Sequence, residues 1–94
     1  MYIVRDSFKA KPGMASKLAA MFKDVMSQQK DAKVRILTDY VGPYNSVIME
    51  FEVPDLAAFE KRMKEYSEGK DIREKMKGYT DMYLSGGREI YRVM

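Results

Sequence analysis

The chain of 94 residues contains no cysteine, no histidine and no tryptophan. Without cysteine it has no disulfide, no thiolate nucleophile and no thiolate ligand for a metal. The lack of histidine removes the most common general base and the most common metal ligand. Only a metal site made of oxygen ligands remains, and no acidic loop has the spacing that such a site requires. We therefore expect no metal and no cofactor.

The sequence also lacks a long apolar run. No segment approaches the ~18 residues of a membrane-spanning helix, and the N-terminus has the pattern of a strand instead of a signal peptide. We therefore expect a soluble, cytoplasmic protein with no membrane partner.

The charged residues, 17 basic and 14 acidic with a net charge of +3, are interleaved along the chain. They are densest in residues 60–77, where pairs such as Glu60 and Lys64 have the i,i+4 spacing of a solvated helix face. A nucleic-acid site instead requires a segregated basic patch. No nucleic-acid partner is therefore expected.

The length of 94 residues indicates one domain, which we place at residues 1–94. A chain of this size buries only about 60–65% of its unfolded surface, and dimerisation is a common way to add stability. The nine methionines fit either gap-filling in a small core or a soft binding surface. Most of them fall on expected apolar stripes, which favours the core for Met14, Met21, Met49, Met63 and Met76.

Residues 33–41 and 46–53 alternate in a way that predicts a β-hairpin with its turn at residues 42–45. One face of this hairpin is almost wholly apolar, and the other mixes charged with aliphatic side chains. Such a pair of strands needs two differently covered sides. The expected partners across the hairpin are Val34 with Val53, Ile36 with Phe51, Thr38 with Met49, Tyr40 with Val47, Arg35 with Glu52, Leu37 with Glu50, and Asp39 with Ile48.

The remaining pattern predicts a strand at residues 2–9, a helix from Pro12 to about residue 29, and a second helix that Asp55 caps. Gly69 interrupts the second helix, a helical piece covers residues 71–83, and residues 85–87 form a turn before a last strand at 88–93. The order β-α-β-β-α-(α)-β predicts a ferredoxin-like, four-stranded antiparallel sheet with the helices on one face. A doubly wound α/β fold is the alternative, but the central hairpin is too short to hold a crossover helix.

The sheet face opposite the helices is too apolar for open water and too charged for a dry core. A second copy of the chain, docked face to face, resolves this conflict, and the protein itself is therefore the expected partner. Ile90, Tyr91 and Arg92 cannot be assigned to a face, because both parities of the last strand carry an apolar residue. The candidate pocket or interface residues are Arg5, Arg35, Leu37, Asp39, Ile48, Glu50 and Tyr91.

The element order resembles the dimeric α+β barrel superfamily, in which two ferredoxin-like sheets close into a barrel. The resemblance rests on the lead-in at residues 11–13, on the strand and capped helix at residues 47–59, and on residues 87–93, which look like the last strand of NIPSNAP-like members. The superfamily includes antibiotic-biosynthesis monooxygenases, muconolactone isomerases and haem-degrading enzymes. Haem-degrading members use a histidine and a tryptophan, and this chain has neither. No catalytic residue carries over by position.

Three groups of residues have chemical potential. Arg5 or Arg35 can hold a substrate anion with Glu50 as a base, although cross-strand ion pairs are the favoured interpretation. The residues 85–87 favour a simple turn over a phosphate cradle, because a strand and no helix follows. The tyrosines can orient a phenolic substrate but are also ordinary strand residues; they are Tyr40, Tyr44, Tyr79, Tyr83 and Tyr91.

These observations predict a homodimer that binds a small molecule between the sheet and the helices or inside the barrel. If the protein is an enzyme, the resemblance implies a cofactor-free monooxygenase or isomerase that acts on a small polar-aromatic compound. A binding or assembly module without chemistry is the alternative.

Overall fold

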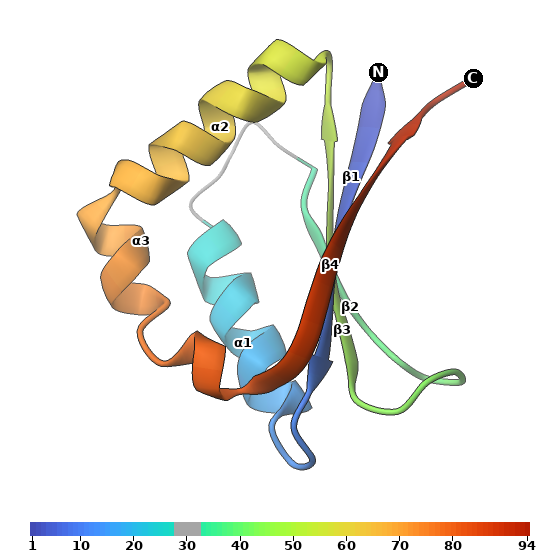
Figure 1. Ribbon diagram of the computed structural model, residues 1–94, viewed down its shortest axis with the longest axis vertical. Helices are drawn as coiled ribbons and strands as arrows, with labels where there is room; N and C mark the ends of the chain where they lie inside the picture. The colour runs from blue at the N-terminus through green and yellow to red at the C-terminus, as the bar shows by residue number, and fades with distance from the viewer. Residues whose placement is uncertain (28–32) are drawn as a thin grey trace.

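The computed structural model describes residues 1–27 and 33–94, which form four strands and three helices around one sheet (Figure 1). Within these ranges no helix is long and apolar enough to cross a membrane. The elements are β1 (Tyr2–Ala10), α1 (Ala15–Met26), β2 (Arg35–Thr38), β3 (Ser46–Val53), α2 (Leu56–Glu68), α3 (Lys70–Lys75), a single 3₁₀ turn (Tyr79–Asp81) and β4 (Tyr83–Arg92).

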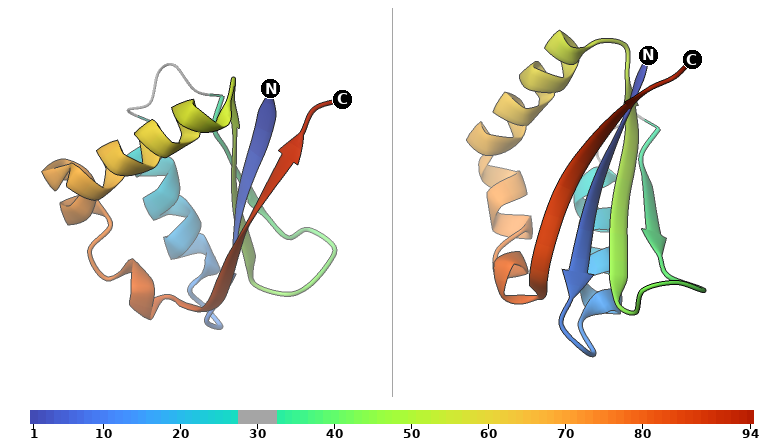
Figure 2. Two further views of the ribbon diagram at one scale, coloured as in Figure 1. Left: turned by 45° about the horizontal axis from the view of Figure 1, so that its top comes forward. Right: turned by 45° about the vertical axis from the view of Figure 1, so that its right-hand side comes forward.

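The four strands form one antiparallel sheet in the order β2-β3-β1-β4, and all helices lie on the same face of it (Figure 2). The ferredoxin-like prediction is therefore confirmed. The two chain ends lie side by side, because Tyr2 pairs with Arg92 and the Val93 N–H donates to the Met1 carbonyl at 3.0 Å (Figure 1). The opposite face of the sheet, which we call the open face, is not covered by any described element.

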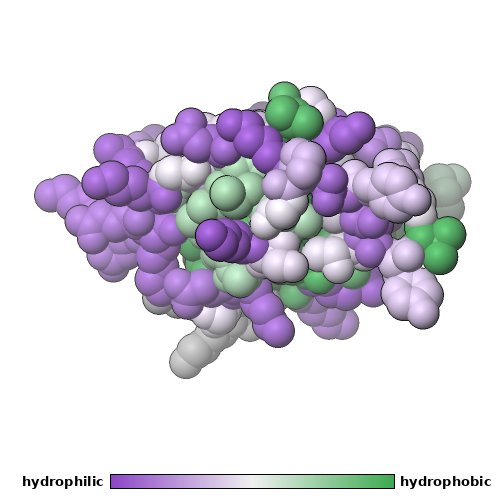
Figure 3. Space-filling view, turned by 90° about the horizontal axis from the view of Figure 1, so that it is seen from below, coloured by the Kyte–Doolittle hydropathy of each residue, from purple (hydrophilic) through white to green (hydrophobic). Residues whose placement is uncertain are grey.

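The core lies between α1 and the helix-covered face of the sheet. Leu18, Phe22, Val25 and Met26 form one face of α1, and all four are buried. They pack against alternate residues of the sheet such as Val4 and Phe51, and each fully buried side chain of this kind contributes about 1.5–3 kcal/mol. Pro12 lies in the turn before α1 and not in its first turn as predicted, and the predicted end of the helix lies outside the described residues. Seen from below, pale green and white residues of moderate hydropathy gather near the middle of the surface, and hydrophilic side chains cover most of the rest (Figure 3).

Helix α2 begins and ends where the sequence predicts. The Asp55 carboxylate accepts the Ala58 N–H at 2.7 Å, and Gly69 takes an extended conformation after the helix. The prediction of a helix through residues 71–83 was wrong in its second half. Helix α3 ends at Lys75, because Gly78 adopts the left-handed conformation (φ +86°) and starts the single 3₁₀ turn.

The register of the β2–β3 hairpin differs from the predicted one by two residues. Arg35 pairs with Glu50 and Leu37 with Ile48, instead of with Glu52 and Glu50. The strand ends at Thr38 because the Asp39 carboxylate accepts the Ser46 N–H at 2.9 Å and closes the loop early. A slip of two residues keeps every side chain on its predicted face, so the two faces are confirmed although the partners are not.

Strand β4 begins at Tyr83, so the predicted turn at residues 85–87 was wrong. Gly86 lies opposite Phe8, and a Cβ there would be 3.1 Å from Phe8 Cδ1 and 3.3 Å from the Ser7 carbonyl oxygen. A side chain at this position would have to displace the Phe8 ring, which packs with its centre 5.0 Å from the ring centres of Phe22 and Tyr83. Strand β4 starts shortly after the single 3₁₀ turn, without an intervening loop.

Candidate functional site

Three of the predicted site residues form one ion-pair cluster on the open face. Glu50 lies between two arginines: Arg5 donates from Nε and Nη2 to Oε2 at 3.1 and 2.9 Å, and Arg35 donates to Oε1. Only 6% of the Glu50 side chain is exposed, against 40% for Arg5 and 69% for Arg35. The two-residue change in register creates this cluster, because it brings Arg35 directly opposite Glu50.

The cluster fixes the protonation of its members. The hydrogen bond from Arg35 lowers the pKa of Glu50, and the one from Arg5 adds to this effect against the opposing effect of burial. The Glu50 carboxylate in turn raises the pKa of Arg5. Glu50 is therefore a stable anion and a weaker base than a free glutamate.

The register of β4 resolves the side that Tyr91 takes. Tyr91 pairs with Ile3 on the open face, and its ring centre lies 5.7 Å from Arg5 Cζ. Leu37 and Ile48 are opposite each other on this face and half-buried. Asp39 is separate from the group, because its carboxylate is engaged with the Ser46 N–H in the β2–β3 loop. The structure thus brings together all the predicted residues except Asp39.

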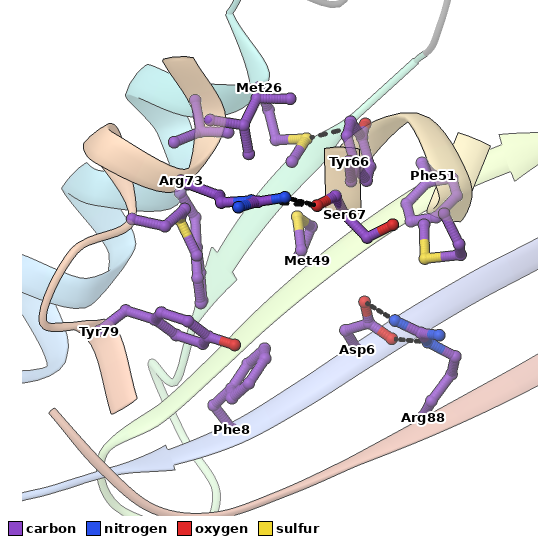
Figure 4. A pocket seen from close by; sticks show the side chains of 15 residues that line it. Asp6, Phe8, Met26, Met49, Phe51, Tyr66, Ser67, Arg73, Tyr79 and Arg88 are labelled. Carbon is purple, nitrogen blue, oxygen red and sulfur yellow. Dashed lines mark hydrogen bonds and ion pairs between the residues drawn. The ribbon is translucent and has the colours of Figure 1, made fainter. Parts of the chain in front are cut away.

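A cavity of about 420 Å³ lies on the other side of the sheet, between the helix-covered face and the helices (Figure 4). We call it the helix-side pocket. Strands β1, β3 and β4 form its floor, and α1, α2, α3 and the 3₁₀ turn form its walls. Its lining is mainly apolar, with several methionine and aromatic side chains: Phe8, Phe22, Val25, Met26, Met49, Phe51, Met63, Tyr66, Ile72, Met76 and Tyr79.

Two arginines and one aspartate supply the charge of this pocket. Arg88 of β4 donates from Nε and Nη2 to the two carboxylate oxygens of Asp6 at 2.5 and 3.1 Å, and this pair raises the pKa of Arg88. Arg73 of α3 donates from Nε and Nη2 to the Ser67 carbonyl oxygen at 3.1 and 2.8 Å. In Figure 4 these two groups lie on opposite sides of the pocket. Within residues 1–27 and 33–94, no group of three or more acidic side chains could hold a metal ion.

Sequence reasoning missed the polar residues of this pocket. Asp6 interrupts the apolar alternation of β1 at an inward position between Val4 and Phe8, and a charge there needs a partner. That interruption of the apolar alternation could have identified Asp6 as a candidate pocket residue. Arg88 was assigned only to the start of a strand. The methionines Met49, Met63 and Met76 pack against the core as predicted, but they also line the cavity.

No protein-family model matches this chain, and no curated protein is similar to it. Solved structures do match over its full length. An uncharacterised NIPSNAP domain protein from Burkholderia xenovorans has a TM-score of 0.84 at 12% identity, covering 100% of this chain and 95% of that chain. A NIPSNAP family protein from Agrobacterium tumefaciens also gives 0.84, at 10% identity, covering 99% and 85%. An antibiotic biosynthesis monooxygenase gives 0.74 at 12% identity, covering 100% and 99%. At these identities the likeness shows the fold alone, and it is the fold that the sequence resemblance implied.

Proposed function

We propose that this protein is a homodimer that binds a small polar-aromatic compound in the helix-side pocket. The observation that carries the proposal is the apolar cavity of about 420 Å³ with the Asp6–Arg88 pair on its floor. Small-molecule sites are typically clefts of roughly 300–1,000 Å³ with apolar walls and a few polar groups that fix orientation. Aromatic rings such as Phe51 and Tyr66 supply stacking surfaces for a planar ligand.

The open face supports the dimer. Its half-buried Leu37 and Ile48 lie next to the Arg5–Glu50–Arg35 cluster, which is a composition that suits an interface better than open water. Two such faces, related by a two-fold axis, bring aliphatic groups together and let the charges pair at the rim. The dimeric α+β barrel that the sequence resembles has this arrangement.

The reaction class that fits the resemblance is a cofactor-free monooxygenation or isomerisation. One of the solved structures with this fold is described as an antibiotic biosynthesis monooxygenase. Either reaction begins when the substrate loses a proton, and a carboxylate at hydrogen-bond distance is the group that takes it. Each oxygen of Asp6 has a lone pair left after its bond to Arg88, so it can accept a hydrogen bond from a substrate hydroxyl.

The open face offers a second location for the same chemistry. There Arg5 or Arg35 would hold the anionic group of a ligand inside the barrel, and Glu50 would take the proton. Arg5 and Arg35 both bind Glu50 and lower its pKa, which makes it a weak base. Asp6, by contrast, is paired with Arg88 alone among the described residues. For this reason we place the ligand on the helix side of the sheet.

One observation favours the alternative of a non-enzymatic assembly module. The β2–β3 loop carries three large side chains in the solvent: Tyr40, Val41 and Tyr44 are 100%, 90% and 83% exposed. Aromatic groups of this kind are typical anchors of protein interfaces. An assembly module would bind a protein partner through this loop and would leave the helix-side pocket empty.

The binding experiment uses N-phenyl-1-naphthylamine, a neutral aromatic dye that fluoresces in apolar surroundings. We expect saturable binding at one dye per chain. Ile72→Trp, which fills the pocket from α3, should abolish it, whereas Leu56→Trp, which adds the same ring on an exposed part of α2, should not. Circular dichroism confirms that both variants fold. Absence of dye binding to the wild-type protein, or equal binding to both variants, would overturn the proposal.

A further inference from the structure

The charges that line the helix-side pocket do not cancel. The Asp6 carboxylate and the Arg88 guanidinium neutralise each other through two parallel hydrogen bonds. Arg73 is held by the Ser67 carbonyl oxygen, which is a neutral acceptor. Among residues 1–27 and 33–94, no carboxylate lies within ion-pair distance of Arg73. The lining therefore carries one net positive charge, and Arg73 is its source.

Two hydrogen bonds within the chain orient the Arg73 side chain. Both Nε and Nη2 donate to the same oxygen, at 3.1 and 2.8 Å, so the plane of the guanidinium is set by the end of α2. Among residues 1–27 and 33–94, no acceptor bonds to Nη1, which can therefore donate to a ligand. A guanidinium oriented in this way loses little side-chain entropy when it binds an anion, and guanidinium geometry suits carboxylates and other oxyanions.

The pocket walls between Arg73 and the Asp6–Arg88 pair indicate which kind of uncharged ligand moiety fits the pocket. Met26, Met49, Met63 and Met76 all line the pocket, and thioether sulfur makes favourable contacts with aromatic ring edges. The rings of Phe51 and Tyr79 lie on different sides of the same space, with the Tyr79 hydroxyl directed into it (Figure 4). These groups suit a flat aromatic body better than a bulky polar one.

We infer that the ligand of the helix-side pocket is a planar aromatic compound that carries one anionic group, and that Arg73 binds this anion. The inference rests on the proposed function, since it names the class of ligand for the same pocket. The aromatic body packs between the methionines, and the anion reaches the guanidinium at the rim. Arg73 is thus a specificity-determining residue that discriminates anionic from neutral ligands of the same shape.

The test is a competition between two ligands that differ only in charge. 2-Naphthoate and its neutral isostere 2-naphthamide are each used to displace N-phenyl-1-naphthylamine from the wild-type protein. Because Arg73 is exposed, we expect naphthoate to bind about fivefold more tightly, the ratio that an ion pair of up to roughly 1 kcal/mol produces. Equal affinity of the two compounds, or a preference for the amide, would overturn the inference while the proposed function stands. Failure of the dye itself to bind would overturn both.

Two substitutions assign the preference to Arg73. Arg73→Gln should make the affinities for naphthoate and naphthamide about equal. The affinity for naphthamide should stay unchanged. Arg73→Lys keeps the charge and should keep part of the preference, which separates charge from any structural role of the bonds to Ser67. Lys77→Gln removes an exposed positive charge that does not line the pocket, and should leave the preference intact. If Lys77→Gln and Arg73→Gln reduce the preference equally, general electrostatic attraction explains it and the assignment to Arg73 is wrong.

Discussion

Replacing Glu50 with glutamine tests the ion-pair cluster on the open face. The change keeps the shape of the side chain but removes the charge that faces Arg5 and Arg35. Removing one partner of a buried ion pair typically costs about 3–5 kcal/mol, because the other charge is left uncompensated. Here Glu50 is buried, but the two arginines are 40% and 69% exposed in the single chain, and at the rim of the proposed interface water can still solvate them. We therefore expect Glu50→Gln to lower the free energy of unfolding by about 1–2 kcal/mol at neutral pH.

The same cluster predicts how this cost depends on pH. The folded-state pKa of Glu50 lies below its ordinary value, since both arginines favour the carboxylate. The stability that Glu50 contributes is therefore complete above the unfolded pKa of about 4.3, and it is lost as the pH falls through the folded-state pKa. Because a protonated glutamate resembles glutamine, the difference between wild type and Glu50→Gln should shrink steadily below about pH 4.

Urea unfolding, followed by circular dichroism at one fixed protein concentration, measures both effects. Glu52→Gln is the matched control, because Glu52 is on the same strand and the same face but takes part in no ion pair among the described residues. We expect it to change stability by less than about 0.5 kcal/mol. A cost of Glu50→Gln no greater than that of Glu52→Gln, or a cost that is the same in acid as at neutral pH, would contradict a stabilising role of the ion-pair cluster.

Two further substitutions test the packing and the assembly. Gly86→Val should lower the free energy of unfolding by about 1–3 kcal/mol, because its Cβ would be 3.1 Å from the Phe8 ring, while Gly87→Val, which meets nothing within 4 Å, should not. Thermal unfolding compares the two, and equal effects would contradict the close approach at Gly86. Leu37→Asp should convert the proposed dimer of 10.9 kDa chains into monomers or unfold it, because it places an unpaired charge in the proposed interface. Thr38→Asp, which adds the same charge at an exposed position of the other face, should not. Sedimentation equilibrium measures the mass, and a wild type that is already monomeric, or an unchanged Leu37→Asp dimer, would refute the proposed docking face.

Alternation along the strands was enough to predict the two faces of the sheet but not the pairing within it. Val47, Met49, Phe51 and Val53 alternate with the mixed set Ser46, Ile48, Glu50 and Glu52, and this period of two determines which face of the sheet each side chain takes. A shift of two residues in the strand register leaves every side chain on the same face. The sequence could therefore not distinguish Glu50 from Glu52 as the partner of Arg35. The true register depends on the Asp39 side chain, which ends β2 early.

At the glycines of the last strand, the local sequence pattern led to a wrong secondary-structure prediction. Two adjacent glycines after a serine are typical of a turn, and local pattern alone favours that interpretation. The strand conformation of Gly86 depends on Phe8, which is distant in the sequence and contacts it only in the folded sheet. For the same reason Tyr91 could not be assigned to a face before the β1–β4 register was known.

The space between the sheet and the helices was one of the two expected pocket locations, but the residues that line it could not be predicted. The distance of α2 and α3 from the sheet decides whether Met63 and Met76 fill the core or border a cavity, and that distance is a tertiary property. Asp6 was visible as a charge at an inward position, yet its partner Arg88 comes from the far end of the chain. No local sequence pattern indicates an ion pair between residues so far apart in the sequence.

Methionine methyl NMR tests most directly whether the helix-side pocket is the binding site. The chain has nine methionines, and Met26, Met49, Met63 and Met76 line the pocket. When 2-naphthoate is added to protein with labelled methionine methyl groups, the signals of these residues should shift and saturate together. The signals of Met1, Met14 and Met94, which do not line the pocket, should stay in place. Shifts confined to methionines outside the pocket, or no shifts on binding, would contradict the account.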